Sequence, residues 1–358
     1  MTSSNFYQAL KDLTDEKNIP ISVLVSAIED ALMAAYRKNF DTQEDVKVTL
    51  EENTGHFHVI ARRTVVVDDD AIEEADKQYS LEEAQEIKPD AQVGDVIEED
   101  VTPKDFGRIA AQTARQVVSQ KLKEAERNLI LKDFQNRIGK VLSGKVLRVE
   151  RGAVFVEFSK AEAVLPPKEQ IPGENFRAND RIKCYVKEVE SGNKGPQIIL
   201  SRKDPKFVEK LFESAVPEIQ EGIVEIKSVA REPGLRVKVA VFSKESRVDP
   251  VGACVGLKGG RIKGIVDELN GEKIEIIKFS LNPVEYVTNA LSPAKVQSVT
   301  VSHDGRSALA VVQPAQQSLA IGKEGQNVKL ASKLTGIKID IKTEKELEAG
   351  EPKAPAAS

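Results

Sequence analysis

The chain has 358 residues and a formal net charge of −5, with 57 Asp and Glu against 52 Lys and Arg. Hydrophobic residues make up 40% of the sequence, which fits a folded globular chain. No apolar run reaches the roughly 18 residues that a membrane helix needs, and the polar N-terminus lacks the pattern of a secretory signal. We therefore expect a cytoplasmic protein with no membrane segment.

Cysteine and histidine are too scarce to suggest a metal centre. The only two cysteines, Cys184 and Cys254, cannot form a disulfide framework or a four-ligand zinc site, and they fit a reducing compartment. His56 and His58 share one face of a predicted strand, but no cysteine or third histidine lies near them. We expect ordinary hairpin residues there, and neither a metal nor another cofactor.

The first hundred residues divide into helices, a hairpin and a strongly acidic segment. Apolar residues at helical spacing predict two helices within residues 1–40. Alternating apolar residues on either side of a turn predict a hairpin over residues 46–59. Residues 65–100 then hold fourteen Asp or Glu against two Lys.

A basic segment follows at residues 102–148, with eleven Lys or Arg against four acidic residues. Thr102 suits a helix N-cap and Pro103 suits the first helical position, so a long helix is predicted. Its apolar face would carry Phe106, Ile109, Ala110, Thr113 and Val117. The opposite face carries Lys104, Arg108 and Arg115. This face is either merely solvated, or a cationic strip directed at phosphates or an acidic partner.

Short alternating segments replace the helical pattern over residues 139–203. They predict five strands, at Val141–Val149, Val154–Phe158, Ala163–Leu165, Ile182–Val189 and Gln197–Leu200. Turns rich in Gly, Asn and Pro separate these strands. Five strands within about sixty residues are typical of an OB-type barrel.

The rest of the chain contains an internal repeat, in which residues 204–281 and 282–345 share the element order αββααβ of a type II KH module. The elements predicted for the first copy include a helix at Pro205–Val216 and strands at Ile223–Ala230, Leu235–Phe242 and Lys273–Ile277. Those of the second copy include a helix at Pro283–Leu291 and strands at Val296–Val301, Ala308–Val312 and Ile337–Ile341.

Each copy also carries a glycine-x-x-glycine loop between two helices. Two residues without side chains let a nucleic-acid backbone approach the main chain, and the following helix presents free N–H groups to phosphate. KH modules clamp about four nucleotides in this way. The alternative is a pair of packing glycines without a ligand, but packing does not require a lysine between the glycines.

The residues expected to bind RNA are Gly256, Leu257, Lys258, Gly259, Gly260, Arg261 and Lys263 in the first copy, and Gly322, Lys323, Glu324, Gly325, Gln326 and Asn327 in the second. The negative charge of Glu324 weakens the positive field of the second loop. We therefore expect the two copies to differ in their affinity for phosphate.

Enzyme motifs do not fit the sequence. Gly322-Lys323 is followed by Glu324, and Gln317 stands where a P-loop has its first glycine. An RNA-processing enzyme is an alternative, because exoribonucleases also combine KH modules with an OB-type barrel of the S1 class. Those enzymes, however, carry large catalytic domains ahead of these modules. A ribosome-associated RNA-binding protein is a further alternative. We expect an RNA-binding protein that is not an enzyme.

Several stretches carry a resemblance to a known family. They are Phe106-Gly107-Arg108-Ile109-Ala110-Ala111-Gln112-Thr113-Ala114, the segments 162–166 and 247–256, Asn282-Pro283, and the segment 320–328. Together with the domain order, they resemble the NusA family of bacterial transcription elongation factors over residues 1 to about 345. We expect a multidomain α+β fold: an N-terminal α/β domain at 1–138, an S1-type OB β-barrel at 139–203, two tandem KH modules at 204–281 and 282–345, and a disordered tail at 346–358.

The resemblance implies a function in transcription. The N-terminal domain would dock on RNA polymerase near the RNA exit channel, with Lys104, Arg108 and Arg115 as its cations there. The KH modules would hold nascent single-stranded RNA. The factor, expected to be a monomer, would modulate pausing, intrinsic termination and antitermination together with other antitermination factors.

Two departures from the family pattern change these expectations. Nucleic-acid-binding S1 barrels usually carry exposed aromatics and a histidine on their binding face, but this chain has Arg151-Gly152-Ala153-Val154-Phe155 there and Pro166 in place of the histidine. We expect a barrel that serves mainly as a spacer. The chain ends in a short polar tail instead of acidic repeats, so regulation through such repeats is not expected.

Overall fold

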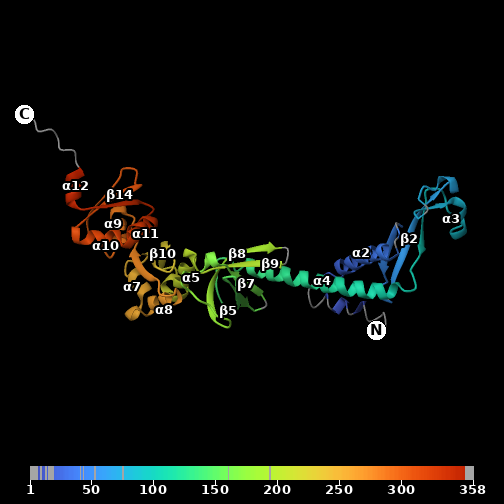
Figure 1. The fold of residues 1–358 in the computed structure, drawn as a ribbon, viewed down its shortest axis with the longest axis horizontal. Helices are drawn as coiled ribbons and strands as arrows, with labels where there is room; N and C mark the ends of the chain where they lie inside the picture. The colour runs from blue at the N-terminus through green and yellow to red at the C-terminus, as the bar shows by residue number, and fades with distance from the viewer. Residues whose placement is uncertain are drawn as a thin grey trace, which may run out of the picture. The chain divides into compact units, whose positions relative to one another are not determined.

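The computed structural model describes residues 7–350 except 9, 13, 15–19, 41, 43, 52, 53, 75, 160, 193 and 194. Contacts within the chain divide it into two compact units, residues 1–129 and residues 130–358. The division falls inside the long helix α4 (Phe106–Gln135; Figure 1), whereas we expected the first domain to end at residue 138. Parts of the first predicted helix, Asn53 of the hairpin turn and residues 351–358 lie outside the described residues.

The first unit packs helices against a mixed sheet. Its elements include α2 (Ile21–Phe40), β1 (Val46–Leu50), β2 (Phe57–Val66), β3 (Gln78–Ser80), α3 (Leu81–Ile87) and β4 (Val96–Asp100). Strand β2 pairs antiparallel with β1 and β4 and parallel with β3, which confirms the predicted hairpin. The apolar face of α2 and the first turns of α4 share one core with this sheet, including Leu24, Ile28, Val59 and Phe106.

Helix α4 begins at Phe106 and not directly after Thr102, the expected N-cap. The Thr102 hydroxyl accepts a hydrogen bond from the Val59 N–H at 2.8 Å. It therefore bonds to a backbone N–H of strand β2 and does not cap the helix. Phe106 and Ala110 are buried as predicted, and the structure adds Ala114, which is fully buried. The expected helix is therefore confirmed with a later start.

The acidic segment, residues 65–100, has a small core of its own. Val65, Ala84, Ala91 and Ile97 are buried together. The Ser80 side chain accepts from the backbone of Glu83 and completes a capping box at the start of α3. Strand β3 has three residues, helix α3 has seven and strand β4 has five, and such short elements leave no periodic pattern in the sequence.

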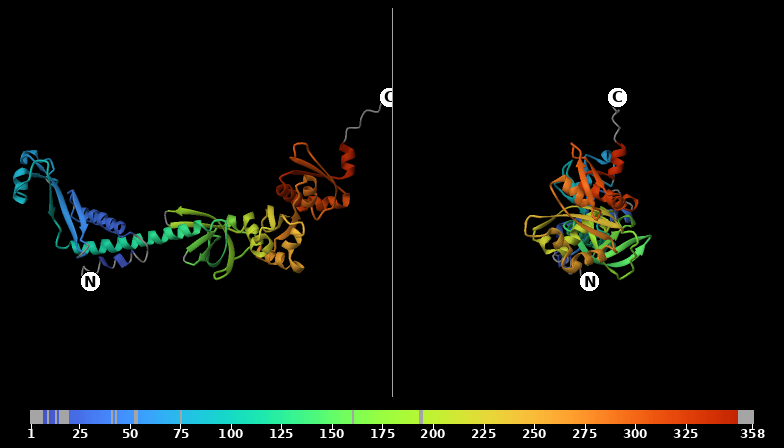
Figure 2. Two further views of the ribbon diagram at one scale, coloured as in Figure 1. Left: turned by 180° about the vertical axis from the view of Figure 1, so that it is seen from behind. Right: turned by 90° about the vertical axis from the view of Figure 1, so that its left-hand side faces the viewer.

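The second unit begins with a closed five-stranded barrel, green in Figure 2. Its strands are β5 (Val141–Glu150), β6 (Ala153–Phe158), β7 (Ala161–Leu165), β8 (Arg181–Gly192) and β9 (Gly195–Ser201). They close in the order β5-β6-β7-β9-β8, so all five predicted strands are confirmed. Val146, Val156 and Leu200 fill the interior, which Phe134 from the last turn of α4 joins.

The first KH module has the predicted αββααβ order with one addition, the short helix α6 (Pro217–Gln220). Its other elements are α5 (Pro205–Ala215), β10 (Val224–Glu232), β11 (Arg236–Ser243), α7 (Pro250–Val255), α8 (Gly260–Glu268) and β12 (Lys273–Lys278). Strand β11 pairs antiparallel with β10 and parallel with β12. Helices and sheet enclose a core that includes Phe207, Phe212, Val239 and Leu269.

The second KH module repeats this plan. Its elements are α9 (Pro283–Ala290), β13 (Val296–Val301), β14 (Ser307–Val312), α10 (Pro314–Ile321), α11 (Gln326–Thr335) and β15 (Lys338–Lys342). Strand β14 pairs antiparallel with β13 and parallel with β15. A further helix, α12 (Glu344–Gly350), corrects the expectation of disorder for residues 346–350.

Buried ion pairs join the barrel to the first KH module. Arg202, which directly follows β9, contacts Glu174 of the barrel at 2.6 Å and Glu268 of α8 at 2.9 Å. Arg231 and Glu272, both in the KH module, pair at 2.8 Å with both side chains fully buried, and Arg231 also donates to the carbonyl of Arg202 at 2.7 Å. Because removing charges from water is costly, the complementary partners at this junction fix how the barrel and the module meet.

The core of the second KH module extends into the first. Ala240 and Ile277 of the first module pack with Tyr286 and Leu330 of the second. The fully buried ammonium group of Lys238 contacts Glu275 at 2.6 Å and the carbonyl of Ser292 in the second module at 2.7 Å. Burial lowers the pKa of Lys238, and the two acceptors stabilise its charged form.

Candidate nucleic-acid interface

The first glycine-x-x-glycine loop, residues 256–259, connects α7 to α8 at the surface. Gly256 (φ 74°, ψ 175°) ends α7. Lys258 (φ 50°, ψ 27°) and Gly259 (φ 75°, ψ 15°) then adopt left-handed conformations. Leu257 is 89% exposed and Lys258 is also exposed. Main chain and a cationic side chain are therefore presented to solvent together.

The second loop, residues 322–325, has nearly the same backbone. Gly322 has φ 76° and ψ 169°, Glu324 has φ 55° and ψ 23°, and Gly325 has φ 74° and ψ 16°. Each of these angles lies within about 6° of its counterpart in the first loop. The repeat found in the sequence is thus also a repeat of loop geometry.

Each loop leads into a helix whose N-terminus is not capped by a side chain. The residues at the start of α8 and α11 are Gly259 and Gly325, and neither has a side chain to accept from the first N–H groups. Such helix starts carry partial positive charge and attract phosphate. The exposed side chains of Lys258, Lys263 and Lys323 add full charges beside them.

The second loop differs from the first in its electrostatics. Exposed Glu324 occupies the position that Lys258 holds in the first loop. The ammonium group of Lys329, which the sequence analysis did not include, donates to the carbonyl of Glu324 at 3.1 Å. Lys329 lies one helical turn beyond Gly325, and this spacing could have indicated it.

Two of the expected RNA-binding side chains have partners within the protein. Asn327 is fully buried, and its amide donates to main-chain carbonyls, so it cannot contact RNA as expected. Arg261 is half-buried and pairs with Glu218 at 3.0 Å. Gln326 is also half-buried, whereas Gly260 is exposed.

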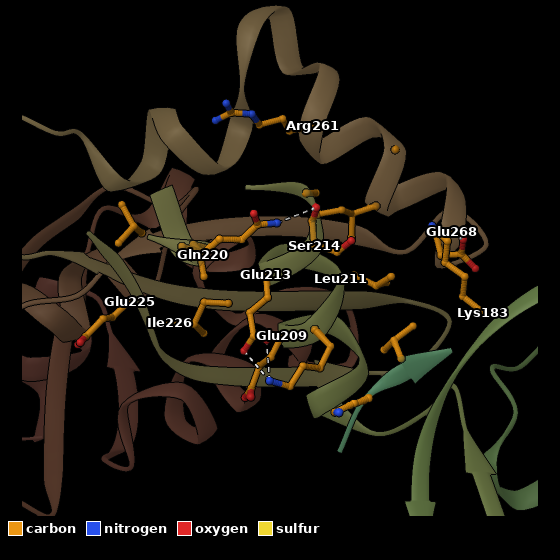
Figure 3. A pocket seen from close by; sticks show the side chains of 18 of the residues that line it. Lys183, Glu209, Leu211, Glu213, Ser214, Gln220, Glu225, Ile226, Arg261 and Glu268 are labelled. Carbon is orange, nitrogen blue, oxygen red and sulfur yellow. Dashed lines mark hydrogen bonds and ion pairs between the residues drawn. The ribbon is translucent and has the colours of Figure 1, made fainter. Parts of the chain in front are cut away.

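A cleft of about 1410 Å³ lies between the barrel and the first KH module, beside α8 (Figure 3). Several of its cations are already paired, with Lys210 contacting Glu213 at 2.6 Å and Lys183 contacting Glu268 at 3.6 Å. A polyanion would find little free positive charge on these walls. Sequence reasoning missed the cleft because its lining comes from the barrel, α5, α6, β10 and α8.

The expected cations of the N-terminal domain are all exposed. Arg108 and Arg115 lie on α4, two turns apart, on the side away from buried Phe106 and Ala110. Lys104 lies in the turn before the helix. The strip is therefore formed by the two arginines, with Lys104 just beyond the helix start.

The part of the chain that the structure describes offers neither a metal-ligand cluster nor a membrane-spanning helix. There, no group of three or more His, Cys, Asp or Glu side chains is arranged to hold a metal ion. His58 contacts Asp100 at 2.8 Å. Within the same residues, no helix has both the length and the apolar character needed to cross a membrane.

Comparison with known proteins identifies every domain. Residues 5–128 match the NusA N-terminal domain, and residues 135–203 match the S1 RNA binding domain. Residues 202–279 match the NusA-like first KH domain, and residues 283–349 match the NusA-like second KH domain. The domain order inferred from the sequence agrees with these matches.

Full-length relatives give the same result. The chain is 50% identical over 342 residues to the transcription termination/antitermination protein NusA of Bacillus subtilis, covering 96% of this chain and 91% of that protein. It is 50% identical over 344 residues to that of Halalkalibacterium halodurans, covering 96% and 89%. It is 44% identical over 345 residues to that of Thermus thermophilus, covering 93% and 88%. With relatives matched along nearly its whole length, this chain belongs to the NusA family.

Proposed function

We propose that this chain is a transcription termination and antitermination factor that docks on RNA polymerase and holds nascent single-stranded RNA. The observation that carries the RNA-binding part is the pair of exposed loops with matching backbone angles, each at an uncapped helix start. The names of the relatives support the role in transcription. We propose a binding role without a catalytic step.

The two loops would hold RNA mainly by its backbone. The ribose-phosphate chain lies against Gly259 and Gly325, where no side chain keeps it away from the main chain. Its phosphates face the first N–H groups of α8 and α11, and Lys258 and Lys323 neutralise further charge. Because the core of the second module extends into the first, RNA held at one loop remains near the other, which raises its effective concentration there.

The two clamps would contribute unequally. The first loop offers Lys258, where the second offers Glu324. A carboxylate at this position repels phosphate and weakens a site whose attraction is electrostatic. We infer that the first module provides most of the affinity for phosphate and that the second extends the length of RNA held.

The polymerase-binding part is assigned to the N-terminal domain. Arg108 and Arg115 form an exposed strip on α4, and such a strip suits the phosphates of an RNA hairpin at the exit channel. Lys104 adds charge beside it. Other antitermination factors are the further partners that the family membership suggests.

Affinity for an unstructured single-stranded RNA, measured over a series of salt concentrations, tests the RNA-binding part. The double variant Lys258→Glu with Lys323→Glu should bind at least about tenfold more weakly, because two attractive charges become repulsive. Lys38→Glu with Lys47→Glu, at exposed positions on α2 and β1, reverses two charges away from both loops and should have no effect. Unchanged affinity in the double variant would refute the clamp assignment. Co-purification with ribosomes instead of RNA polymerase would refute the polymerase assignment.

A further inference from the structure

Within each KH module, the residue two positions after the second glycine of the loop makes equivalent contacts. It is Arg261 in the first module and Asn327 in the second. The Arg261 guanidinium donates to the carbonyl of Ala253 at 2.6 Å. The Asn327 amide donates to the corresponding carbonyl, that of Leu319, at 3.3 Å and to the carbonyl of Ala320 at 3.0 Å. Two chemically different side chains thus bond to the end of the helix before the loop.

A second contact of each side chain is also shared. Arg261 pairs with Glu218, which lies on α6 between the first helix and first strand of its module. Asn327 donates to the carbonyl of Leu291, at 3.0 Å, in the same interval of the second module. Each residue stands at the start of the helix that follows the loop. From there it bonds to two places: the end of the helix that precedes the loop, and the segment that follows the first helix of the module.

The first glycine of each loop accommodates this side chain. A Cβ on Gly256 would lie 2.6 Å from Cγ of Arg261, and a Cβ on Gly322 would lie 2.8 Å from the backbone nitrogen and 2.9 Å from Cβ of Asn327. By contrast, a Cβ on Gly259 would come no closer than 3.9 Å to a neighbouring atom. The first glycine is therefore required because a Cβ there would collide with Arg261 or Asn327. The second glycine is required because the backbone there is left-handed.

We propose that Arg261 and Asn327 are positioning residues, which hold the two loops in the form that receives RNA and do not contact RNA themselves. The proposal depends on the proposed RNA-binding function. Both loops contain a non-glycine residue in the left-handed region, Lys258 and Glu324, and this conformation is unfavourable for an isolated residue. Hydrogen bonds that close the loop from behind keep it in place. Figure 3 shows Arg261 at the edge of the cleft, on α8.

The decisive variant is suggested by the chain itself. Because the two loops share their backbone angles, an asparagine at position 261 should reach the Ala253 carbonyl as Asn327 reaches that of Leu319. Arg261→Asn thus removes the charge and keeps the donor, and Arg261→Leu removes both. Arg261 is the position to test, because it is half-buried and more tolerant of change than fully buried Asn327.

Affinity of the full chain for an unstructured single-stranded RNA should remain within about twofold of wild type in Arg261→Asn and fall about tenfold in Arg261→Leu. The slope of log affinity against log salt should be unchanged in Arg261→Asn. If Arg261 instead contacts phosphate, both variants lose affinity and that slope shrinks by about 0.7. That result overturns the proposal.

Amide hydrogen exchange separates this proposal from the RNA-binding function. The N–H groups of Gly256 and Gly259 donate within the loop region, to Gly252 at 2.9 Å and to Gly256 at 3.1 Å. They should exchange faster in Arg261→Leu and at the wild-type rate in Arg261→Asn, whether or not RNA is present. Wild-type exchange in Arg261→Leu refutes the positioning role. If the two variants show the expected exchange rates but the wild-type chain binds no RNA, only the proposed function is refuted.

Discussion

The guanidinium of Arg148 lies over the ring of Phe155, with its central carbon 4.1 Å from the ring centroid. Arg148 also contacts Glu150 and Glu162, both at 2.5 Å. Phe155 lies in the stretch that this chain has where RNA-binding S1 barrels carry exposed aromatics, and an ion-paired arginine covers its ring. This arrangement supports the expectation that the barrel is mainly a spacer, because neither the ring nor the charge is free.

Releasing Arg148 should therefore give the barrel affinity for RNA. We expect the double variant Glu150→Gln with Glu162→Gln to bind single-stranded RNA a few-fold more tightly, with a salt slope steeper by about 0.7, because one cation becomes available to phosphate. Glu74→Gln, which breaks the exposed pair with Lys77, is the control. The hydrogen bond to Arg148 lowers the pKa of Glu162. Mild acid therefore does not protonate Glu162 and cannot release Arg148 in place of the substitution. An unchanged slope would contradict this account.

The second glycine of the first loop is the better position at which to disrupt RNA binding. Gly256→Asp would create a clash with Arg261 and disturb the fold. At Gly259 an added Cβ meets no close neighbour, so Gly259→Asp places a negative charge where phosphate should lie. We expect affinity for single-stranded RNA to fall about tenfold or more, and the left-handed φ of 75° at Gly259 should lower the unfolding midpoint modestly.

Gly271→Asp is the matched control. Gly271 belongs to the same module, has a left-handed φ of 85° and has open space around the position of a Cβ. The substitution therefore introduces the same charge and the same backbone strain away from the loop. Equal loss of RNA affinity in both variants would mean that overall charge, not the loop, determines binding.

The sequence predicted the architecture well because its signals are local or repeated. Strand alternation located the barrel, and two copies of one element order located the KH modules. The loops followed from their glycines, since a positive φ and close approach both favour that residue. Short elements were missed: α6 has four residues, too few for a periodic pattern.

The direction of single polar side chains could not be predicted in the same way. Arg261 and Asn327 stand in the first turn after a loop, where sequence does not tell whether a polar group faces solvent or the carbonyls behind it. Thr102 was misjudged for a related reason. Its hydroxyl bonds to Val59, 43 residues away, and such a partner is visible only once the fold is known.

The buried pair between Arg231 and Glu272 should matter more for stability than the exposed pairs. Glu272 also accepts from the Gly234 N–H at 2.5 Å. Glu272→Gln leaves the fully buried Arg231 guanidinium without its counter-charge, and we expect a loss of about 3–5 kcal/mol in the free energy of unfolding. Glu213→Gln, which breaks the largely exposed pair with Lys210, should cost less than about 1 kcal/mol. Similar urea midpoints for the two variants would contradict the ranking.

The arginine strip on α4 should act on transcription without acting on the KH loops. Arg108 and Arg115 are exposed, and the residues that pack this part of α4 into its unit, Phe106, Ala110 and Ala114, lie on another face. We expect Arg108→Ala with Arg115→Ala to reduce hairpin-dependent pausing by RNA polymerase in a single-round transcription assay. Affinity for single-stranded RNA should stay at the wild-type value, because neither arginine belongs to a loop.

A double variant on the same helix provides the control for this test. Lys123→Ala with Arg127→Ala removes the same charge from exposed positions further along α4. If pausing depends on the strip itself, this control pauses like wild type while the Arg108 and Arg115 variant does not. If both variants lose pausing equally, the helix contributes only its total positive charge. In that case the attraction to the polymerase complex is long-range and should fade as added salt screens it over about 10 Å or less.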